Sequence, residues 1–403
     1  MESKDISRPY LLINTIQNYP WGKQNESAFI ARLLNIDPPR DEPFAELWMG
    51  THPNGPSKLI DPDRGIIDLA EWIAENPVNR LSHDRSTQYS GKLPYMLKVL
   101  SAGQMLSIQT HPDKTQAEQL HAQDPTHYPD DNHKPELAIA IDSLDALVGF
   151  ISDAEFKELL STTPELGELL DQGSSLEVGV KRLLELWKDS PEILQSSIRS
   201  LCKRLNSQTE HSEGEALILE QSRIYGTEDM GLLFILLLNR VRLEAGQAVF
   251  LGPGIPHAYL KGNIIECMAN SDNVVRLGLT GKFCDPAALT EVLNFDPDQK
   301  VQVRVETDGQ MTHYPTPTDE FRVRSLALDE GEHFSFKDRS ELTLFLVLQG
   351  EIKLHWCSDE STCCSIFNRG ESFLTPANLS NYSVQARTDS LIYLVELPRA
   401  PRL

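Results

Sequence analysis

The segment Gly246-Gln-Ala-Val-Phe-Leu-Gly-Pro-Gly-Ile-Pro-His257 combines a short apolar run with a turn of glycine and proline that ends on a histidine. Val249 and Phe250 favour a strand, and the Gly-Pro-Gly turn ends that strand directly after them. The turn is therefore predicted to place the imidazole of His257 at the edge of a sheet. A lone histidine in such a turn is more often a hydrogen-bonded loop residue than a metal ligand, so its role depends on its partners.

Two earlier segments offer suitable partners at predicted strand ends. In Ser107-Ile-Gln-Thr-His-Pro-Asp113, Gln109 and His111 are two residues apart, so on a strand their side chains leave the same face. Asn132-His-Lys-Pro-Glu136 precedes an apolar run, which places the Glu136 carboxylate at a strand entrance. With His257, these segments supply one amide, two imidazoles and one carboxylate, a mixed set suited to Zn2+.

The rest of the chain predicts a β protein that a helical segment interrupts. From Leu11 to about Phe150, short apolar runs alternate with turns rich in proline, glycine and asparagine. Ser152-Asp-Ala-Glu155 is a capping box, and Ser190-Pro191 begins another amphipathic run. Residues from about 152 to 228 are therefore predicted to be helical.

Strand patterns return after the helical segment. They are expected at 237–251, by strict alternation in Val301-Gln-Val-Arg-Val305, and again from about Glu320 to the end of the chain. The last part is predicted to form a second, smaller all-β unit. Its segment 370–381 repeats the spacing of the His257 turn, but Asn381 stands where the histidine would be. We therefore expect this unit to hold no metal and to pack against the first.

Composition and charge limit the possible partners. A chain of 403 residues predicts two or three domains, and 37 Lys and Arg against 59 Asp and Glu give a net charge of −22. That charge repels nucleic acid and anionic membranes. The longest apolar run, 231–238, is far shorter than the roughly 20 residues of a membrane-spanning helix, and the first thirty residues contain no apolar signal segment. We expect a cytoplasmic protein that binds neither nucleic acid nor membrane and carries six free thiols.

Taken together, the motifs resemble those of the type I phosphomannose isomerases, zinc-dependent cupin enzymes that interconvert mannose 6-phosphate and fructose 6-phosphate. The resemblance covers essentially the whole chain. The segments that carry it, in the family's order, are Tyr19-Pro-Trp-Gly22, Ala45-Glu-Leu-Trp-Met-Gly-Thr-His-Pro53, Ser107-Ile-Gln-Thr-His-Pro-Asp-Lys114, Asn132-His-Lys-Pro-Glu136, Pro253-Gly-Ile-Pro-His257 and Ser271-Asp-Asn-Val-Val-Arg276.

The resemblance implies a mainly β fold of two cupin (jelly-roll) barrels with an α-helical insert domain. On this basis we expect a catalytic cupin at 1–151 and 229–319, the insert at 152–228, and a metal-free C-terminal cupin at 320–403. The site residues that it implies are the ligands of one Zn2+ per chain, Gln109, His111, Glu136 and His257, and an active-site arginine, Arg276.

The resemblance also implies an isomerase that acts through an enediol(ate) and supplies mannose 6-phosphate for GDP-mannose synthesis and glycosylation. Its partner would be a small sugar phosphate, and we expect a monomer. The phosphate carries roughly two negative charges, so cations inside the motifs are candidates to hold it. These candidates are Lys98, Lys134 and Arg276.

The remaining substrate contacts and the base stay open between alternatives. Glu46 and Glu266 are candidates for contact with the sugar. Trp21 and Trp48 are candidates to stack on it, with burial in the core an equal alternative. The proton acceptor is Glu46, His52, Glu266 or a zinc-bound water.

Two positions depart from the family's usual pattern, and two other functions compete with isomerisation. Leu277 and Gly281 stand where alanine and proline are typical, which puts the packing under Arg276 in question but removes no ligand. Without Gln109, the other ligands match the two-histidine, one-carboxylate set of iron-dependent oxygenases. The second alternative is a two-cupin protein that binds sugar phosphate without converting it.

Overall fold

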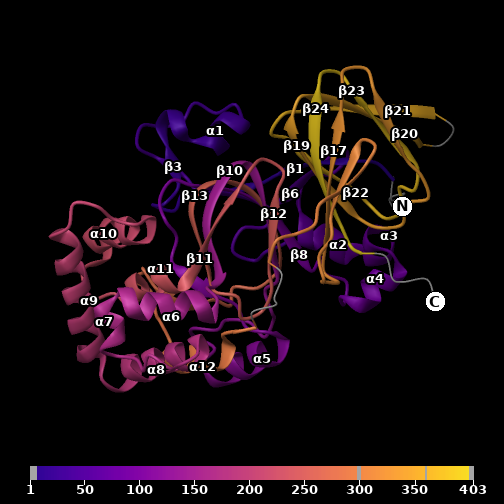
Figure 1. Ribbon diagram of the computed structural model, residues 1–403. Helices are drawn as coiled ribbons and strands as arrows, with labels where there is room; N and C mark the ends of the chain where they lie inside the picture. Colours follow the sequence, from indigo (N-terminus) through magenta and orange to yellow (C-terminus); the bar gives the residue numbers. More distant parts are fainter. Residues whose placement is uncertain (1–6, 297–300, 359–360, 399–403) are drawn as a thin grey trace.

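Strands dominate the computed structural model, which describes residues 7–296, 301–358 and 361–398 (Figure 1). One nine-stranded sheet carries the predicted ligand segments. Its strands are β2 (Thr15–Gln17), β5 (Glu46–Gly50), β8 (Tyr95–Ala102), β9 (Ile108–Thr110), β10 (Glu136–Phe150), β11 (Leu238–Leu243), β12 (Ala248–Leu251), β13 (His257–Ala269) and β14 (Val275–Gly278). Central strands β8 and β13 are almost wholly buried, and β10 is buried over its first five residues, 136–140.

A second nine-stranded sheet combines the C-terminal segment with strands from the N-terminal part. Its strands are β1 (Tyr10–Ile13), β6 (Lys58–Asp61), β7 (Gly65–Asp68), β15 (Glu306–Asp308), β16 (Met311–Tyr314), β17 (Arg322–Leu328), β19 (Thr343–Gln349), β22 (Ser372–Thr375) and β24 (Ser390–Glu396). A four-stranded sheet of β18 (His333–Phe336), β20 (Glu351–Ser358), β21 (Ser361–Asn368) and β23 (Tyr382–Ala386) accompanies it. All elements described after residue 300 are strands, as predicted, and the first of them, β15, begins at Glu306, before residue 320.

The predicted helical segment is confirmed, and it extends further than expected. Its helices are α6 (Asp153–Thr162), α7 (Pro164–Gly167), α8 (Leu176–Asp189), α9 (Pro191–Asn206), α10 (Glu213–Tyr225) and α11 (Gly231–Leu237). Both bonds of the capping box between Ser152 and Glu155 are present at the start of α6. Helix α11 lies beyond the expected end at 228, because its sequence Gly-Leu-Leu-Phe-Ile-Leu-Leu is apolar on all sides and is therefore buried as a helix.

Other short elements were not predicted, and one predicted strand is wrong. The additional elements are β3 (Lys23–Gln24), η1 (Asn25–Ser27), α1 (Phe29–Leu33), β4 (Pro43–Phe44), α2 (Leu69–Glu75), α3 (Pro77–Leu81), α4 (His83–Gln88), α5 (Lys114–Gln123) and α12 (Pro286–Val292). Residues 301–305 form only one isolated bridge, between Gln302 and Val249. Two backbone hydrogen bonds hold this segment beside β12. Its alternating valines therefore pack against the hydrophobic core, although the segment forms no regular strand pairing with β12.

Helices α6–α10 and the C-terminal strands lie on opposite sides of the sheet that carries the ligands (Figure 1). A single hydrophobic cluster joins that sheet to the C-terminal strands, since it contains Leu97, Ile265 and Val395. The Tyr95 hydroxyl also donates a hydrogen bond to the carbonyl of Val395, over 3.0 Å. The C-terminal segment therefore packs against the first part of the chain through a shared core.

The sequence also predicts free thiols and no membrane-spanning segment. All six cysteines are free thiols, as expected. Among the described residues, no helix has the length and apolar character needed to cross a membrane.

Candidate active site

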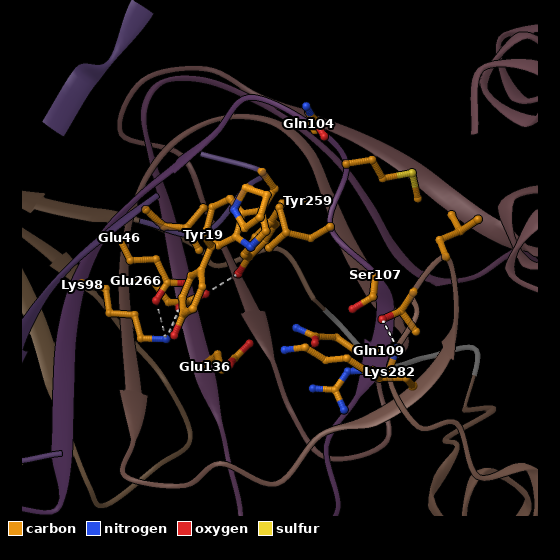
Figure 2. Close-up of a pocket in the computed structure, with 18 of the residues that line it drawn as sticks. Tyr19, Glu46, Lys98, Gln104, Ser107, Gln109, Glu136, Tyr259, Glu266 and Lys282 are labelled. Atoms are coloured by element: carbon orange, nitrogen blue, oxygen red, sulfur yellow. Dashed lines mark hydrogen bonds and ion pairs between the residues drawn. The ribbon is translucent and has the colours of Figure 1, made fainter. Parts of the chain in front are cut away.

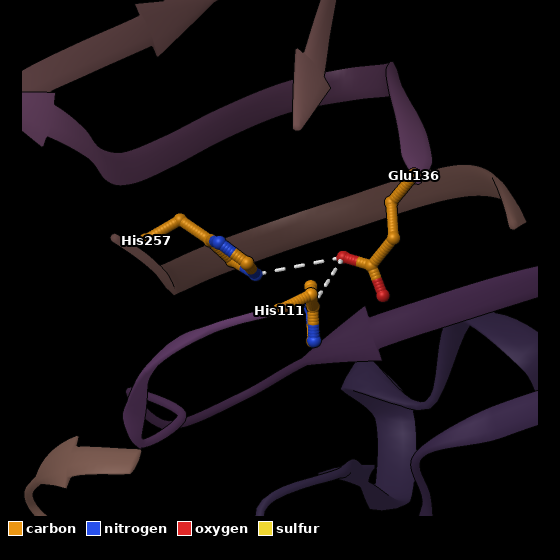
Figure 3. Close-up of side chains that lie close together, drawn as sticks. All are labelled: His111, Glu136 and His257. Carbon is orange, nitrogen blue, oxygen red and sulfur yellow. Dashed lines mark ion pairs between the residues drawn. The ribbon is translucent and has the colours of Figure 1, made fainter. Parts of the chain in front are cut away.

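Two histidines and one glutamate from three separate segments meet at one buried point (Figure 3). His111 directly follows β9, Glu136 begins β10, and His257 begins β13. Strand pairing brings these ends together, because β13 lies antiparallel to both β10 and β9. One ligand atom from each side chain lies within 4.8 Å of the others, and all three residues are buried.

Hydrogen bonds to the backbone fix which nitrogen of each histidine faces this point. His111 Nδ1 lies 2.9 Å from the carbonyl oxygen of Asn273, and His257 Nδ1 lies 3.0 Å from that of Ile255. A carbonyl oxygen only accepts, so each Nδ1 carries the proton and each Nε2 offers a lone pair. The two Nε2 atoms lie 3.4 and 3.5 Å from Glu136 Oε2.

The charge states of these groups suit a divalent metal ion. Burial lowers the pKa of His111 to about 4, so its imidazole is neutral near pH 7. Burial alone would raise the pKa of Glu136, but Lys134 and His111 outweigh it and hold that pKa well below the ordinary value. Within the described part of the chain, His111 Nε2 and Glu136 Oε2 are buried without a hydrogen-bond partner. Such buried, unsatisfied donors of electron pairs fit a bound metal.

The amide of Gln109 lies at the same point. Its Nε2 atom is 3.4 Å from His257 Nε2, and the two residues face each other in the β9–β13 pairing. The oxygen and nitrogen of an amide exchange places by a rotation of the terminal group, so the Gln109 oxygen can be directed to the metal point. The structure thus brings together all four residues of the predicted ligand set.

A cavity of about 360 Å³ adjoins the metal-binding group (Figure 2). Nine of the predicted candidates line it: Trp21, Glu46, Trp48, Lys98, Gln109, Lys134, Glu136, Glu266 and Arg276. His52 is not among its lining residues; its Nε2 atom lies 3.3 Å from Oδ1 of Asp272, which does line the cavity. The fold thus brings most of the predicted candidates to one cavity.

One end of the cavity holds a buried cluster of acidic and basic groups. Lys98 Nζ lies 3.5 Å from Glu46 Oε2 and 3.4 Å from Glu266 Oε2. Lys98 and Glu266 face each other on β8 and β13, which explains their contact. Burial alone would lower the pKa of Lys98, but Glu46 and Glu266 raise it above its ordinary value.

Glu266 is the carboxylate in this cluster whose pKa is clearly raised. Burial is the main cause, and the charge of Glu136 adds to it, while Lys98 acts in the opposite direction. The hydroxyl of Tyr259 donates a hydrogen bond to Glu266 Oε1 over 2.9 Å. Oε2 of Glu46 accepts a hydrogen bond from the indole of Trp48 and also contacts Lys98.

The other end of the cavity is cationic. Figure 2 shows Ser107, Gln109 and Lys282 there, and Arg276 pairs with Gln109 between β14 and β9. Within the described residues, neither Arg276 nor Lys282 has an ion-pair partner, and burial lowers the pKa of both side chains. Lys98 and Lys134, in contrast, are already paired with carboxylates.

Sequence reasoning missed Lys282 as a candidate. The available signal was its place in the loop that follows Arg276, but nothing in the sequence shows that this lysine turns back into the cavity. Of the two departures from the family's pattern, Leu277 lies in β14 and Gly281 lies in the loop that follows it. Leu277 is fully buried in the hydrophobic cluster that contains the helices, and a Cβ atom added to Gly281 would meet no atom within 4 Å.

Comparison with known proteins agrees with this site. Residues 10–152 match the phosphomannose isomerase type I catalytic domain. The mannose-6-phosphate isomerase of Homo sapiens is 37% identical over 348 residues, covering 78% of this chain and 81% of its own length. That of Mus musculus is 35% identical over 376 residues, covering 86% and 88%.

Solved structures that resemble this chain are also phosphomannose isomerases. A mannose 6-phosphate isomerase bound with zinc and yttrium is 30% identical, with a TM-score of 0.84 and coverage of 97% of this chain and 100% of its own. A mutant of phosphomannose isomerase from Salmonella typhimurium, also 30% identical, has a TM-score of 0.85 and the same coverage. The fold, the buried metal-binding group and these matches define an isomerase. The chain belongs to the type I phosphomannose isomerase family.

Proposed function

We propose that this chain interconverts mannose 6-phosphate and fructose 6-phosphate with one Zn2+ held by Gln109, His111, Glu136 and His257. The observation that carries the proposal is the convergence of two imidazole Nε2 atoms and one carboxylate oxygen beside a cavity with acid–base groups at one end and unpaired cations at the other. The names of the relatives and the zinc in a similar structure support the same reaction.

Isomerisation moves one proton between C1 and C2 of the sugar and another between their oxygens, through an enediol(ate). A zinc ion in this site supplies a Lewis acid that stabilises negative charge on the sugar oxygens. In our proposal, Glu266 takes the proton from C2 of mannose 6-phosphate and returns it to C1. Its raised pKa brings it closer to the working pH, which suits a group that accepts and then donates a proton.

Other groups in the cluster position Glu266. Lys98 and Tyr259 contact different oxygens of its carboxylate and so fix its orientation. The two other side-chain candidates are less suitable, since Glu46 Oε2 is engaged by Trp48 and His52 is not among the residues that line the cavity. Arg276 is too basic to accept a proton easily, and it is assigned to the sugar oxygens or the phosphate.

The phosphate is assigned to the cationic end of the cavity. Arg276 and Lys282 have no ion-pair partner in the described part of the chain, so a phosphate dianion would supply the missing charge. Ser107 lies at the same end and offers a hydroxyl donor. Lys98 and Lys134, which the sequence offered as candidates for this role together with Arg276, are assigned to orienting Glu266 and Glu136 instead.

Replacing Lys282 with alanine tests the phosphate assignment. A charge-assisted hydrogen bond contributes about 1.5–3 kcal/mol, so KM for mannose 6-phosphate is expected to rise by roughly 10- to 100-fold while kcat stays within about threefold. Steady-state kinetics measure both constants. Lys58→Ala, on the exposed face of β6, removes an equal charge from the surface and is expected to leave KM unchanged. An unaltered KM in Lys282→Ala would refute the assignment.

The proposed reaction is tested by incubating the purified chain with mannose 6-phosphate and measuring fructose 6-phosphate by NMR. Unphosphorylated mannose is the control, and it is expected to react far more slowly because it leaves the cationic end empty. Oxygen consumption without isomerisation would favour the oxygenase alternative. Binding without turnover would favour a sugar-phosphate-binding protein.

We also propose the finer organisation that the sequence predicts. It consists of a catalytic cupin at 1–151 and 229–319, an insert at 152–228 and a metal-free cupin at 320–403. The side chain of Asn381 accepts a hydrogen bond from the backbone N–H of Asp338, which supports a structural role for that turn. A cytoplasmic monomer that supplies mannose 6-phosphate for GDP-mannose synthesis completes the proposal.

A further inference from the structure

Asp229, in the connection between helices α10 and α11, contacts the loop that lines the cationic end of the cavity. Its Oδ1 atom accepts hydrogen bonds from the backbone N–H groups of Gly231 and Leu279, each over 2.8 Å. The first bond holds the start of α11. The second crosses to a residue 50 positions further along the chain. One carboxylate oxygen thus joins the helical segment to the active-site loop.

The loop has an unusual backbone where Asp229 holds it. Leu279 adopts φ +54°, the left-handed region that a leucine rarely occupies, and it is almost fully buried. Such a conformation costs on the order of 1–3 kcal/mol and persists only where its surroundings impose it. The hydrogen bond from the Leu279 N–H to Asp229 stabilises this left-handed conformation of Leu279.

Close contact between two glycines completes the attachment. A Cβ atom added to Gly278 would lie 2.3 Å from the backbone nitrogen of Gly231, and one added to Gly231 would lie 2.8 Å from that of Leu279. The two backbones therefore approach as closely as only glycine permits. The loop is therefore packed in one fixed position against the first residue of α11.

This contact between the loop and α11 lies, along the sequence, between the two cations assigned to the phosphate. Arg276 is in β14 before Leu279, and Lys282 follows it by three residues. Leu279 and Thr280 line the cavity themselves, and the Lys282 N–H donates to the Thr280 hydroxyl over 3.1 Å. A change in the backbone at Leu279 would therefore alter where Lys282 stands relative to Arg276.

We infer that Asp229 is a positioning residue that sets the Arg276–Lys282 pair for phosphate binding. The inference rests on the proposed function in one respect, that these two cations hold the phosphate of the substrate. Asp229 itself does not line the cavity and touches no reacting group. Its effect should therefore appear in the binding of phosphate and not in the chemical step.

Kinetics and phosphate binding of Asp229→Ala test this inference. We expect KM for mannose 6-phosphate and Kd for inorganic phosphate, measured by titration calorimetry, to rise together by about tenfold, because small misplacements of binding groups have effects of this size. We expect kcat to fall by less than about threefold and the zinc content to stay unchanged. Asp229→Asn keeps an oxygen that accepts both hydrogen bonds and is expected to restore both constants to within about threefold of wild type.

Asp68→Ala is the matched control. Asp68 also accepts two backbone hydrogen bonds at a helix start, from Ala70 and Glu71, but it lies away from the cavity. This control is expected to lose stability without a change in KM. If Asp229→Ala is too unstable to assay, Asp229→Glu, whose longer side chain displaces the carboxylate, is measured in its place and is expected to shift both constants in the same direction.

Two results would overturn the inference. One is a wild-type Kd for phosphate in Asp229→Ala, or in Asp229→Glu where that variant is used. The other is a loss in Asp229→Asn as large as in Asp229→Ala. Failure of the proposed function is distinguishable, because it would appear as an absence of turnover in the wild-type chain, whereas phosphate binding is measured without turnover.

Discussion

Replacing His257 with alanine is expected to give a folded protein that retains no zinc and has no isomerase activity. The variant removes one of two buried imidazoles whose Nε2 atoms face Glu136. It removes one of the proposed ligands. A metal site that loses a ligand binds its metal far more weakly, by more than the roughly 10- to 100-fold loss seen when only an outer partner of a ligand is removed. Elemental analysis after dialysis measures the zinc content, and circular dichroism checks the fold.

His333→Ala is the control for this prediction. His333 lies on the exposed face of β18, so its loss removes an imidazole without touching the buried group. The control is expected to keep full zinc content and activity. Full zinc occupancy in His257→Ala would refute the ligand assignment, and a matching loss in His333→Ala would show that the measurement does not report on the buried site.

Replacing Glu266 with glutamine is expected to reduce kcat by at least about 100-fold, because a positioned general base contributes roughly 10²–10⁴-fold. The substitution keeps the size of the side chain and an oxygen for the hydrogen bond from Tyr259. Zinc content and KM are therefore expected to change little. Glu46→Gln is the informative comparison, since Glu46 contacts the same lysine but is not assigned the proton transfer.

The pH dependence of the wild-type enzyme provides a second test of Glu266. Burial and the charge of Glu136 raise its pKa, and only the ionised carboxylate accepts a proton. Activity should therefore fall as the pH decreases through this raised pKa, at a higher pH than the ordinary glutamate value of about 4.3 would give. If the residual activity of Glu266→Gln falls at low pH in the same way as that of the wild type, the fall is caused by the protonation of another group.

The convergence of the proposed ligands could be predicted from the sequence, because they lie in or beside short strands whose ends are marked by local signals. The Gly-Pro-Gly turn before His257 and the proline before Glu136 both end or begin strands in the structure. The helical segment was equally accessible, since its capping boxes and apolar spacing are local. Its extension to Leu237 was missed because an apolar run of seven residues fits a buried strand as well as a buried helix.

Features that depend on contacts between distant segments could not be predicted. The alternation in Val301-Gln-Val-Arg-Val305 indicates a strand, but the segment meets β12 at a single bridge. No local signal shows that β1 would pair with β22 of the C-terminal segment. The sequence also could not show which cations are free to bind a phosphate, because only the fold shows that Lys98 is paired with Glu266 while Lys282 is not paired in the described part of the chain.

The central claim is that the buried group of His111, Glu136 and His257 holds a zinc ion that isomerisation requires. The most direct measurement follows zinc content and conversion of mannose 6-phosphate in one sample, before chelation, after chelation and after zinc is restored. We predict that activity falls in proportion to the zinc removed and returns with about one zinc per chain. Full turnover by zinc-free protein would contradict the claim.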